Sequence, residues 1–155
     1  MKGIDWGTLM LFGGGLSMGA MMFSTGLSQW IGEGMKSMMG GHPSEFFFIA
    51  VFCVMSLLLS ELASHTAAVN LMGTIAISTA LSLGFNPIHV AVGVAMASSL
   101  GFMMPVSTPP NAIVYASGYV PITKMFKSGL IIDILGIFLI TIPIVMWLVK
   151  VIMGV

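Results

Sequence analysis

The stretch "LLLSELASHTAAVN", residues 57–70, places a glutamate, a histidine, an asparagine and several hydroxyl groups in an otherwise apolar chain. The 155 residues are 57% hydrophobic and only 6% charged, and the mean hydropathy is +1.08. Soluble domains carry about 25% charged residues, so a soluble fold would lack the polar surface that it needs. Together with apolar runs of helical length, the composition predicts an all-α integral membrane protein in which this polar stretch has a specific task.

Charge and cysteine content exclude several classes of function. The formal net charge is zero, and no basic face suitable for nucleic acid is present in the sequence. Cys53, the single cysteine, cannot form an intrachain disulfide, and we expect it to pack as a small hydrophobic residue. No two histidines have helical ligand spacing, and the methionines do not cluster with histidine, so we expect neither zinc nor copper and no cofactor.

The first apolar run, residues 8–31, is long enough to cross the membrane, because a full crossing needs roughly 20 helical residues. We interpret it as a transmembrane helix. A signal peptide is disfavoured because Asp5 and Trp6 interrupt the basic start and the apolar stretch continues past Phe23. Residues 32–45 form a polar, glycine-rich connection.

Two shorter apolar runs follow, residues 46–59 and 67–80, each 14 residues long and separated by the polar residues 60–66. Each run would be about 21 Å long as a helix, which is too short to cross alone. A single fused helix would carry two ionisable residues across the bilayer centre. The lengths therefore favour a re-entrant helical hairpin over residues 44–82, with its tip at 60–66.

Residues 88–118 are predicted to form a broken helix. A first part, 88–104, meets "PVSTPPN" at 105–111, where three prolines cannot continue a helix, and the chain then turns apolar again. Irregular backbone at membrane depth is tolerated only where it is buried in protein or lines a cavity. The loop at 105–111 is therefore a candidate functional element.

The last segment, residues 129–153, is predicted to be a transmembrane helix with a kink at Pro143, preceded by a loop. Because the hairpin returns to its own side, the lysines divide three to two between the two sides of the membrane. On one side are Lys2, Lys124 and Lys127, and on the other are Lys36 and Lys150. This bias favours a cytoplasmic location for the larger group and a hairpin that opens to the outside.

Four ionisable residues in or near the apolar segments need an explanation. An acidic group such as Glu61 costs about 2.5–3.5 kcal/mol at a helix centre, so we expect it to be protonated, paired or near water. It either acts directly or supports the hairpin tip. Asp133 is expected to pair with a nearby lysine or to reach water. His42 and His89 stand beside turns and are expected at the membrane interface.

Polar residues at the tip suit ion and anion binding. In transporters, the N-termini of discontinuous helices attract anions, whereas unwound carbonyl groups and helix C-termini coordinate cations. Ser64, His65 and Thr66 can present side chains and N–H groups at the start of the second arm. Sodium prefers hard oxygen donors, which Ser60 and the carbonyl group of Ala63 supply.

An intramembrane hydrolase that uses Ser64 and His65 is a weaker hypothesis. Adjacent residues on a helix diverge by about 100°, so this pair cannot readily form a bond between nucleophile and base. The sequence also has no GxSxG nucleophile elbow. We therefore predict that the chain is not an enzyme.

Three stretches resemble the divalent anion:sodium symporters, the dicarboxylate/citrate/sulfate transporter group. They are "DWGTLMLFGGGLSMG" at 5–19, "ASHTA" at 63–67 and "MPVSTPPNAIVYASG" at 104–118, in the family's order. Members of this family contain two inverted repeats, each with a re-entrant hairpin tipped by Ser-Asn-Thr and a broken helix. The chain resembles the C-terminal repeat alone.

The resemblance implies secondary active transport of a small di- or tricarboxylate, or sulfate, coupled to Na⁺ by an elevator-type motion in the plasma (inner) membrane. It implies a sodium site formed by Ser60, the Ala63 backbone, His65 and the Ser107 backbone. It likewise implies that the substrate carboxylate is bound by Ser64, His65, Thr66, Thr108 and Pro109.

The sequence departs from the family in two ways. His65 replaces the asparagine of the tip, and its nitrogen is a poorer partner for a hard cation, so H⁺ is an alternative coupling ion. The chain also lacks the first repeat, without which the polar tip would face lipid. We expect a fragment of a longer chain or a half that pairs with a partner subunit, the complete transporter being a homodimer. The alternative is a non-transporting, vestigial membrane subunit.

Overall fold

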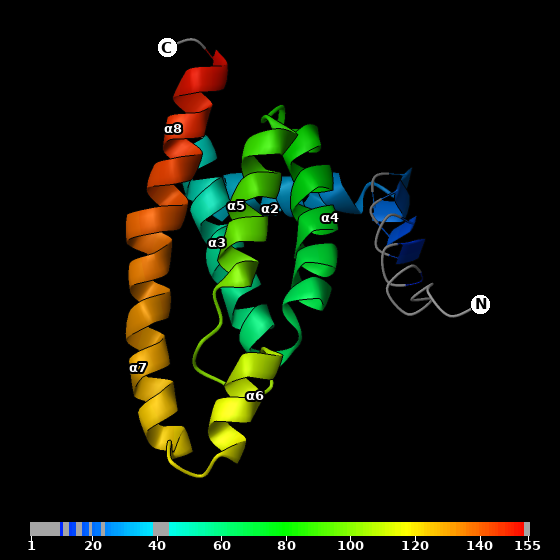
Figure 1. Ribbon diagram of the computed structural model, residues 1–155. Helices are drawn as coiled ribbons and strands as arrows, with labels where there is room; N and C mark the ends of the chain where they lie inside the picture. Colours follow the sequence, from blue (N-terminus) through cyan, green and yellow to red (C-terminus); the bar gives the residue numbers. More distant parts are fainter. Residues whose placement is uncertain are drawn as a thin grey trace, which may run out of the picture.

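The computed structural model describes residues 10, 13–14, 17–18, 20–22, 24–38 and 44–153, and the regular elements among them are all helical. Figure 1 shows a bundle of long helices with α2 crossing it. Among the described residues, three apolar helical segments are long enough to cross a membrane: α3 (Glu45–Leu62), α4 (His65–Leu83) and Ile122–Trp147. The prediction of an all-α membrane protein is confirmed.

Some predicted features cannot be compared with the structure. Most of the motif at 5–19, Lys2 and His42 lie outside the described residues, as does much of the predicted helix 8–31. The division of the lysines between the two sides of the membrane therefore stays a prediction.

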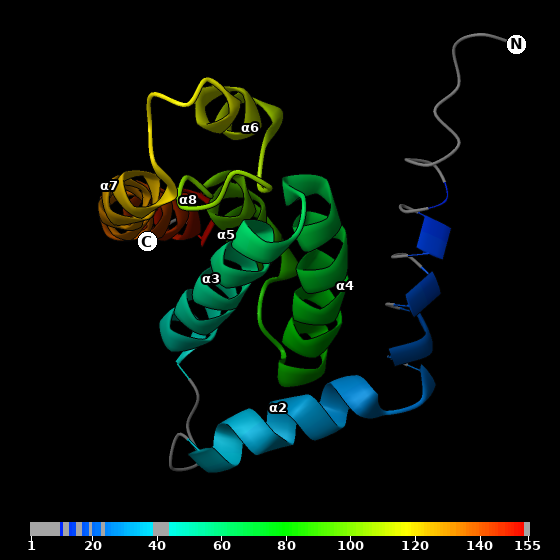
Figure 2. The same ribbon diagram turned by 90° about the horizontal axis from the view of Figure 1, so that it is seen from below.

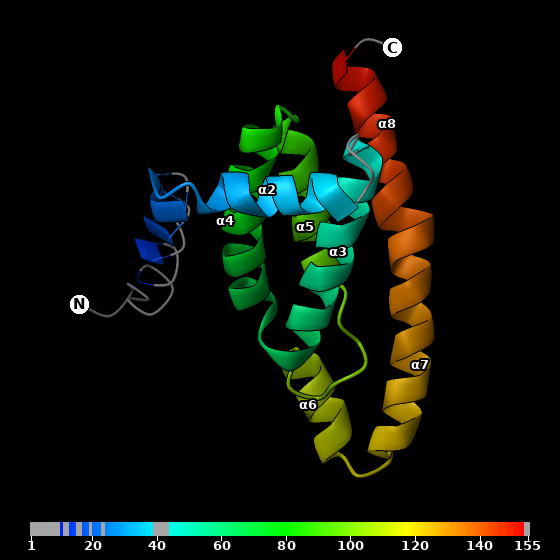
Figure 3. The ribbon, with the colours of Figure 1, turned by 180° about the vertical axis from the view of Figure 1, so that it is seen from behind.

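Helix α2 (Leu27–Met38) lies across the other helices rather than along them (Figures 2 and 3). A turn at residues 25–26 precedes it, and Gly26 adopts a positive φ of 76°. The predictions that one helix continues to residue 31 and that a connection begins at residue 32 are therefore wrong. Helix α2 also packs closely on α4. A Cβ atom on Gly32 would lie 2.9 Å from Leu83 on α4, so this glycine permits close helix contact.

Helices α3 and α4 form a hairpin whose two arms join at residues 63–64. Ser44 caps α3 by accepting a hydrogen bond from the Phe47 N–H group, and Ser64 caps α4 in the same way from Ala67. The arms are 18 and 19 residues long, not 14, because residues 60–62 and 65–66 of the predicted tip are helical and the helices also extend outward to residues 45 and 83. The length argument for a re-entrant path is therefore wrong, and that path stays a prediction.

Helix α5 (Pro87–Ser99) packs against both arms of the hairpin and completes the core. Asn86 caps its start by accepting a hydrogen bond from the Ile88 N–H group. The core consists of aromatic and small side chains from α3, α4, α5 and α8, including Phe48, Phe52, Cys53, Ala76, Ala80, Val90, Val94 and Val145. Cys53 thus lies in the core, as a small hydrophobic residue.

The chain leaves α5 five residues before the predicted helix end at Met104. Residues 100–108, called the break below, have no regular structure, and α6 (Pro109–Ala116) follows. Pro109 and Pro110 occupy the first turn of α6, where a helix needs no N–H donor, so they start a helix rather than interrupt one. The irregular segment therefore lies at residues 100–108, earlier in the chain than the predicted loop 105–111.

The remainder of the chain is one continuous helical segment along the side of the bundle (Figure 1). It comprises α7 (Ile122–Leu135), a π-helical stretch η1 (Gly136–Thr141) and α8 (Ile142–Met153). Lys124 and Lys127 lie on α7, so the predicted loop around them is wrong. The π-helical stretch ends just before Pro143, where the missing N–H group disturbs the α-helical ladder.

Candidate functional site

The hairpin tip and the break lie side by side, and Gly101 leaves no room for a side chain between them. A Cβ atom on Gly101 would lie 2.6 Å from Cε1 of His65 and 3.1 Å from Oγ of Ser60. Gly101 also has a φ of 153°, which residues with side chains rarely adopt. Only glycine therefore fits both the backbone conformation and the space. Sequence reasoning did not select this residue.

The hydroxyl group of Ser60 connects the tip to the break. Its Oγ atom is 2.9 Å from the carbonyl oxygen of Leu57 in its own helix and 2.8 Å from that of Leu100. A hydroxyl group carries one proton, so the two carbonyl oxygens share one donor. The result is a buried group of three oxygen atoms beside His65, of the hard type that Na⁺ prefers.

Ser107 and Asn111 organise the other side of the break. The Ser107 hydroxyl group is 2.7 Å from the Gly101 carbonyl oxygen and 2.8 Å from that of Met104. The amide nitrogen of Asn111 donates to the same two carbonyl oxygens, at 2.9 and 3.1 Å, and to Ser107 at 2.9 Å. Sequence reasoning missed Asn111, although a lone amide directly after two prolines in an apolar segment was an available signal.

Two acidic side chains, one from α3 and one from α7, hold the break. Glu61 is 3% exposed, and its two oxygens accept hydrogen bonds from the N–H groups of Met103 (3.1 Å) and Met104 (2.8 Å). Asp133 is 0% exposed, and the N–H group of Phe102 lies 3.3 Å from both of its oxygens. The prediction that Asp133 pairs with a lysine or reaches water is wrong, because the break supplies its donor inside the protein.

His65 lies at the base of this arrangement. Its ring contacts the position of Gly101, and its Nδ1 atom is buried without a hydrogen-bond partner among the described residues. An unpaired buried nitrogen is costly unless a ligand, an ion or water completes it. Ser60, His65 and Ser107 thus gather around Gly101, and Ala63 ends α3 directly beside them.

A pocket of about 460 Å³ opens next to the break. It is lined by Ser64, Pro105, Val106, Ser107, Thr108, Pro109, Ala112 and Tyr115. Ser64 caps α4 and Thr108 caps α6, so two helix N-termini border one pocket, and each carries partial positive charge. Of the predicted substrate residues, Ser64, Thr108 and Pro109 line the pocket, whereas His65 and Thr66 do not.

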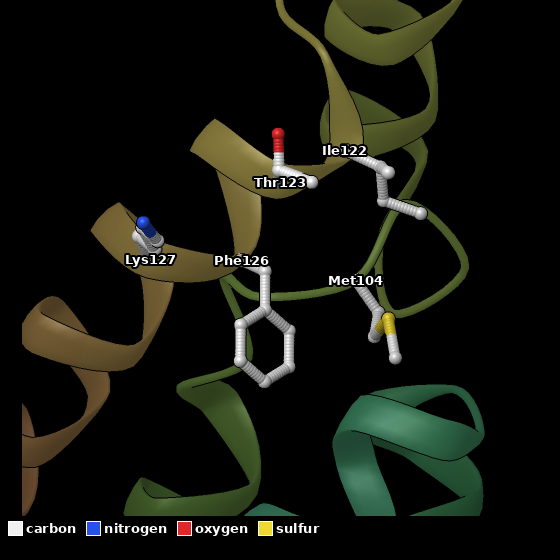
Figure 4. A pocket seen from close by; sticks show the side chains of 5 residues that line it. All are labelled: Met104, Ile122, Thr123, Phe126 and Lys127. Atoms are coloured by element: carbon white, nitrogen blue, oxygen red, sulfur yellow. The ribbon is translucent and has the colours of Figure 1, made fainter.

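A second, apolar pocket lies where α7 starts, and Met104 of the break is part of its lining (Figure 4). Ile122, Phe126 and Lys127 line it together with Thr123. Its lining offers one cation but no pair of helix N-termini, so it lacks the features that make the first pocket a candidate anion site.

His89 lies in the interior of the helix bundle, far along α5 from the break, and its location at the membrane interface stays a prediction. It is 0% exposed, and its Nδ1 atom lies 2.9 Å from Oε1 of Glu45 at the start of α3. The pair joins two helices of the core. In the described part of the chain no three His, Cys, Asp or Glu residues gather as metal ligands.

Comparison with known proteins identifies the family. The profile of the sodium:sulfate symporter transmembrane region matches residues 2–154. The chain belongs to the sodium:sulfate symporter family. This membership confirms the resemblance to the divalent anion:sodium symporters and the prediction of an integral membrane protein.

Several known proteins are about one third identical to the chain over the residues that align with it. The sodium-dependent dicarboxylate transporter SdcS of Staphylococcus saprophyticus is 34% identical over 154 residues, which is 99% of this chain and 29% of that protein. The Na(+)/citrate cotransporter of Rattus norvegicus is 37% identical over 86% of this chain and 23% of that protein. An uncharacterized transporter of Haemophilus influenzae is 38% identical over 93% of this chain and 31% of that protein.

The chain thus spans less than a third of the length of these sodium:sulfate symporter relatives. Their names describe transporters, which agrees with the prediction that the chain is not an enzyme. The candidate site described above thus lies in a member of a membrane transporter family.

Proposed function

We propose that the chain is a half or a fragment of a secondary active transporter for a small di- or tricarboxylate, or sulfate, coupled to Na⁺, and that it needs the first repeat. The observation that carries this proposal is the joint position of two helix N-termini on one pocket, directly beside a buried group of hydroxyl and carbonyl oxygens. The positive helix ends suit an anion, and the oxygens suit a hard cation. Adjacent sites of opposite preference are what cotransport of an anion with Na⁺ requires.

The residues divide between the two ligands. Ser64, Thr108 and Pro109 are proposed to bind a carboxylate group of the substrate, with Thr66 and His65 reached by larger anions. The sodium ligands are proposed to be Ser60, Ala63, His65 and Ser107. With histidine at the tip, H⁺ is the alternative coupling ion, because imidazole can carry a proton near physiological pH.

A partner for the site is part of the proposal. Val106 and Ile113, on the break and α6 near the pocket, are each 70% exposed, and Tyr119 is 90% exposed. Polar backbone at membrane depth needs protein or a water-filled cavity around it. We expect a first repeat, in the same chain or in a partner subunit, to cover this face, with elevator-type alternating access and a homodimeric complete transporter in the plasma (inner) membrane.

The test is ligand-dependent thermal stabilisation of the assembly purified from its native membranes through an affinity tag on this chain. A ligand at 100 times its Kd stabilises the folded state by about 2.7 kcal/mol. Dicarboxylates, citrate and sulfate are each added with and without Na⁺. At least one anion is expected to raise Tm, and more so with Na⁺. The absence of any shift contradicts the proposal and favours a vestigial, non-transporting subunit.

A further inference from the structure

Three consecutive N–H groups of the break, at Phe102, Met103 and Met104, donate to two carboxylates that come from different helices. Glu61 belongs to α3, one residue from Ser60, and Asp133 belongs to α7. Both acidic side chains are buried, and their described donors are the amide groups of the break. The two carboxyl groups also lie next to each other, and two buried acids in a membrane segment are expensive.

The geometry of the peptide unit shows what these bonds achieve. In a trans peptide, the N–H group points opposite to the carbonyl group of the preceding residue, and the unit is planar. No cis peptide is found among the described residues. Fixing the N–H group of Phe102 toward Asp133 therefore turns the Gly101 carbonyl oxygen the other way. That oxygen accepts hydrogen bonds from Ser107 and Asn111.

Glu61 fixes the next two peptide units in the same manner. Its two oxygens each accept one N–H group, so the side chain has two donors for two acceptors. Because Glu61 follows Ser60 in α3, the same turn of helix holds the break and presents the hydroxyl group that contacts the Leu100 carbonyl oxygen. The carbonyl groups of the break are thus oriented by side chains that do not themselves face the pocket.

We propose that Glu61 and Asp133 are positioning residues of the cation site, which hold the amide groups of residues 102–104 and so orient the Gly101 carbonyl oxygen and the backbone that follows it. The inference rests on the proposed function, because it assigns the Gly101 carbonyl oxygen to the coupling cation. Neither acid binds the cation. Each sets the affinity for the cation by holding the backbone that surrounds it.

The two acids respond differently to isosteric replacement. Glu61→Gln places an NH₂ group against one of two N–H donors, so one hydrogen bond becomes a contact between donors. Asp133→Asn can keep its single donor, because the N–H group of Phe102 lies equally far from both oxygens and one oxygen remains. Asp133→Ala removes the acceptor. A matched control is Glu45→Gln, an acid on the same helix α3 whose partner is His89, away from the break.

The experiment measures anion uptake against Na⁺ concentration in proteoliposomes made from the tagged assembly. We expect Glu61→Gln and Asp133→Ala to raise the Na⁺ concentration for half-maximal uptake about tenfold, which corresponds to about 1.4 kcal/mol. Asp133→Asn and Glu45→Gln are expected to stay within about threefold of the unmodified protein. A purely structural role would lower the maximal rate with the amount of folded protein and leave the half-maximal Na⁺ concentration unchanged.

The outcomes separate this inference from the proposed function. Uptake by the unmodified protein that needs no Na⁺ contradicts the proposed function itself. Na⁺-dependent uptake whose half-maximal Na⁺ concentration is the same in Asp133→Ala and Asp133→Asn overturns the positioning role alone. If Glu61→Gln does not fold, the comparison of the two Asp133 variants still decides.

Discussion

Gly101 is a residue of the site at which no side chain can be accommodated. It combines a positive φ with the close approach of His65 and Ser60 across the contact between break and hairpin tip. Any side chain would have to displace the histidine ring and would strain the backbone at the same time. The contact between hairpin tip and break therefore depends on the absence of a side chain here.

Replacing Gly101 by alanine is expected to destabilise the assembly by about 1–3 kcal/mol and to abolish Na⁺-dependent uptake, because backbone strain and the clash with His65 add. Thermal unfolding and uptake measure the two effects. The control is Gly73→Ala, in the middle of α4 with open space around the new Cβ atom, which should leave Tm unchanged or raise it. If Gly101→Ala and Gly73→Ala have the same Tm and the same Na⁺-dependent uptake, the proposed contact is contradicted.

The Ser60 hydroxyl group is the second residue-scale test. Ser60→Ala removes one oxygen from the proposed cation site and the donor to the Leu100 carbonyl oxygen. We expect a several-fold higher Na⁺ concentration for half-maximal uptake, with little change in Tm since a hydrogen bond contributes about 1 kcal/mol. Ser99→Ala serves as control, because Ser99 is exposed and bonds within its own helix. If Ser60→Ala and Ser99→Ala have the same Na⁺ concentration for half-maximal uptake, Ser60 is not a ligand.

Single residues also show what a sequence can and cannot reveal. Glu61 was recognised as a costly residue that needs a partner, and its supporting role was among the options. Its partners are the amide groups of Met103 and Met104, 42 and 43 residues away, which no local pattern indicates. For the same reason the predicted partner of Asp133 is a lysine or water: the break that satisfies it is formed by tertiary packing, which no local pattern indicates.

At the scale of elements, helix starts were easier to predict than helix lengths. The hairpin is predicted to begin at residue 44, and Ser44 caps its first arm as Ser64 caps the second. The predicted arms are too short because the prediction ends the first apolar run before the polar residue Ser60. In the structure its side chain is satisfied by α3 itself and by the break, so the helix continues through it.

The corrected lengths make the depth of the hairpin tip a question for experiment. A nitroxide label on Ser64→Cys, in a Cys53→Ala background, reports its depth through collisions with oxygen dissolved in lipid and with a water-soluble nickel complex. A re-entrant hairpin places residue 64 near the bilayer midplane, whereas two spanning arms place it at the interface. A label at residue 44 gives the interfacial reference. Equal depths at residues 44 and 64 would contradict the re-entrant path.

At the scale of the whole molecule, the fold follows from composition more directly than the site does. An apolar chain with few charges can place its helices only in a membrane, and α3, α4 and α5 pack through small and aromatic side chains. The location of the site needed two elements, the hairpin tip and the break, whose polar residues were visible in the sequence. Their contact through Gly101 was not visible, because it depends on how α5 returns along the hairpin.

The central claim is that this site couples anion movement to Na⁺. The direct measurement is uptake of radiolabelled dicarboxylate, citrate or sulfate into proteoliposomes that contain the tagged assembly, driven in turn by an inward Na⁺ gradient and by an inward pH gradient without Na⁺. We predict that the Na⁺ gradient drives accumulation of at least one anion and that the pH gradient alone does not. Accumulation that follows the pH gradient and ignores Na⁺, or no accumulation under either gradient, would contradict the claim.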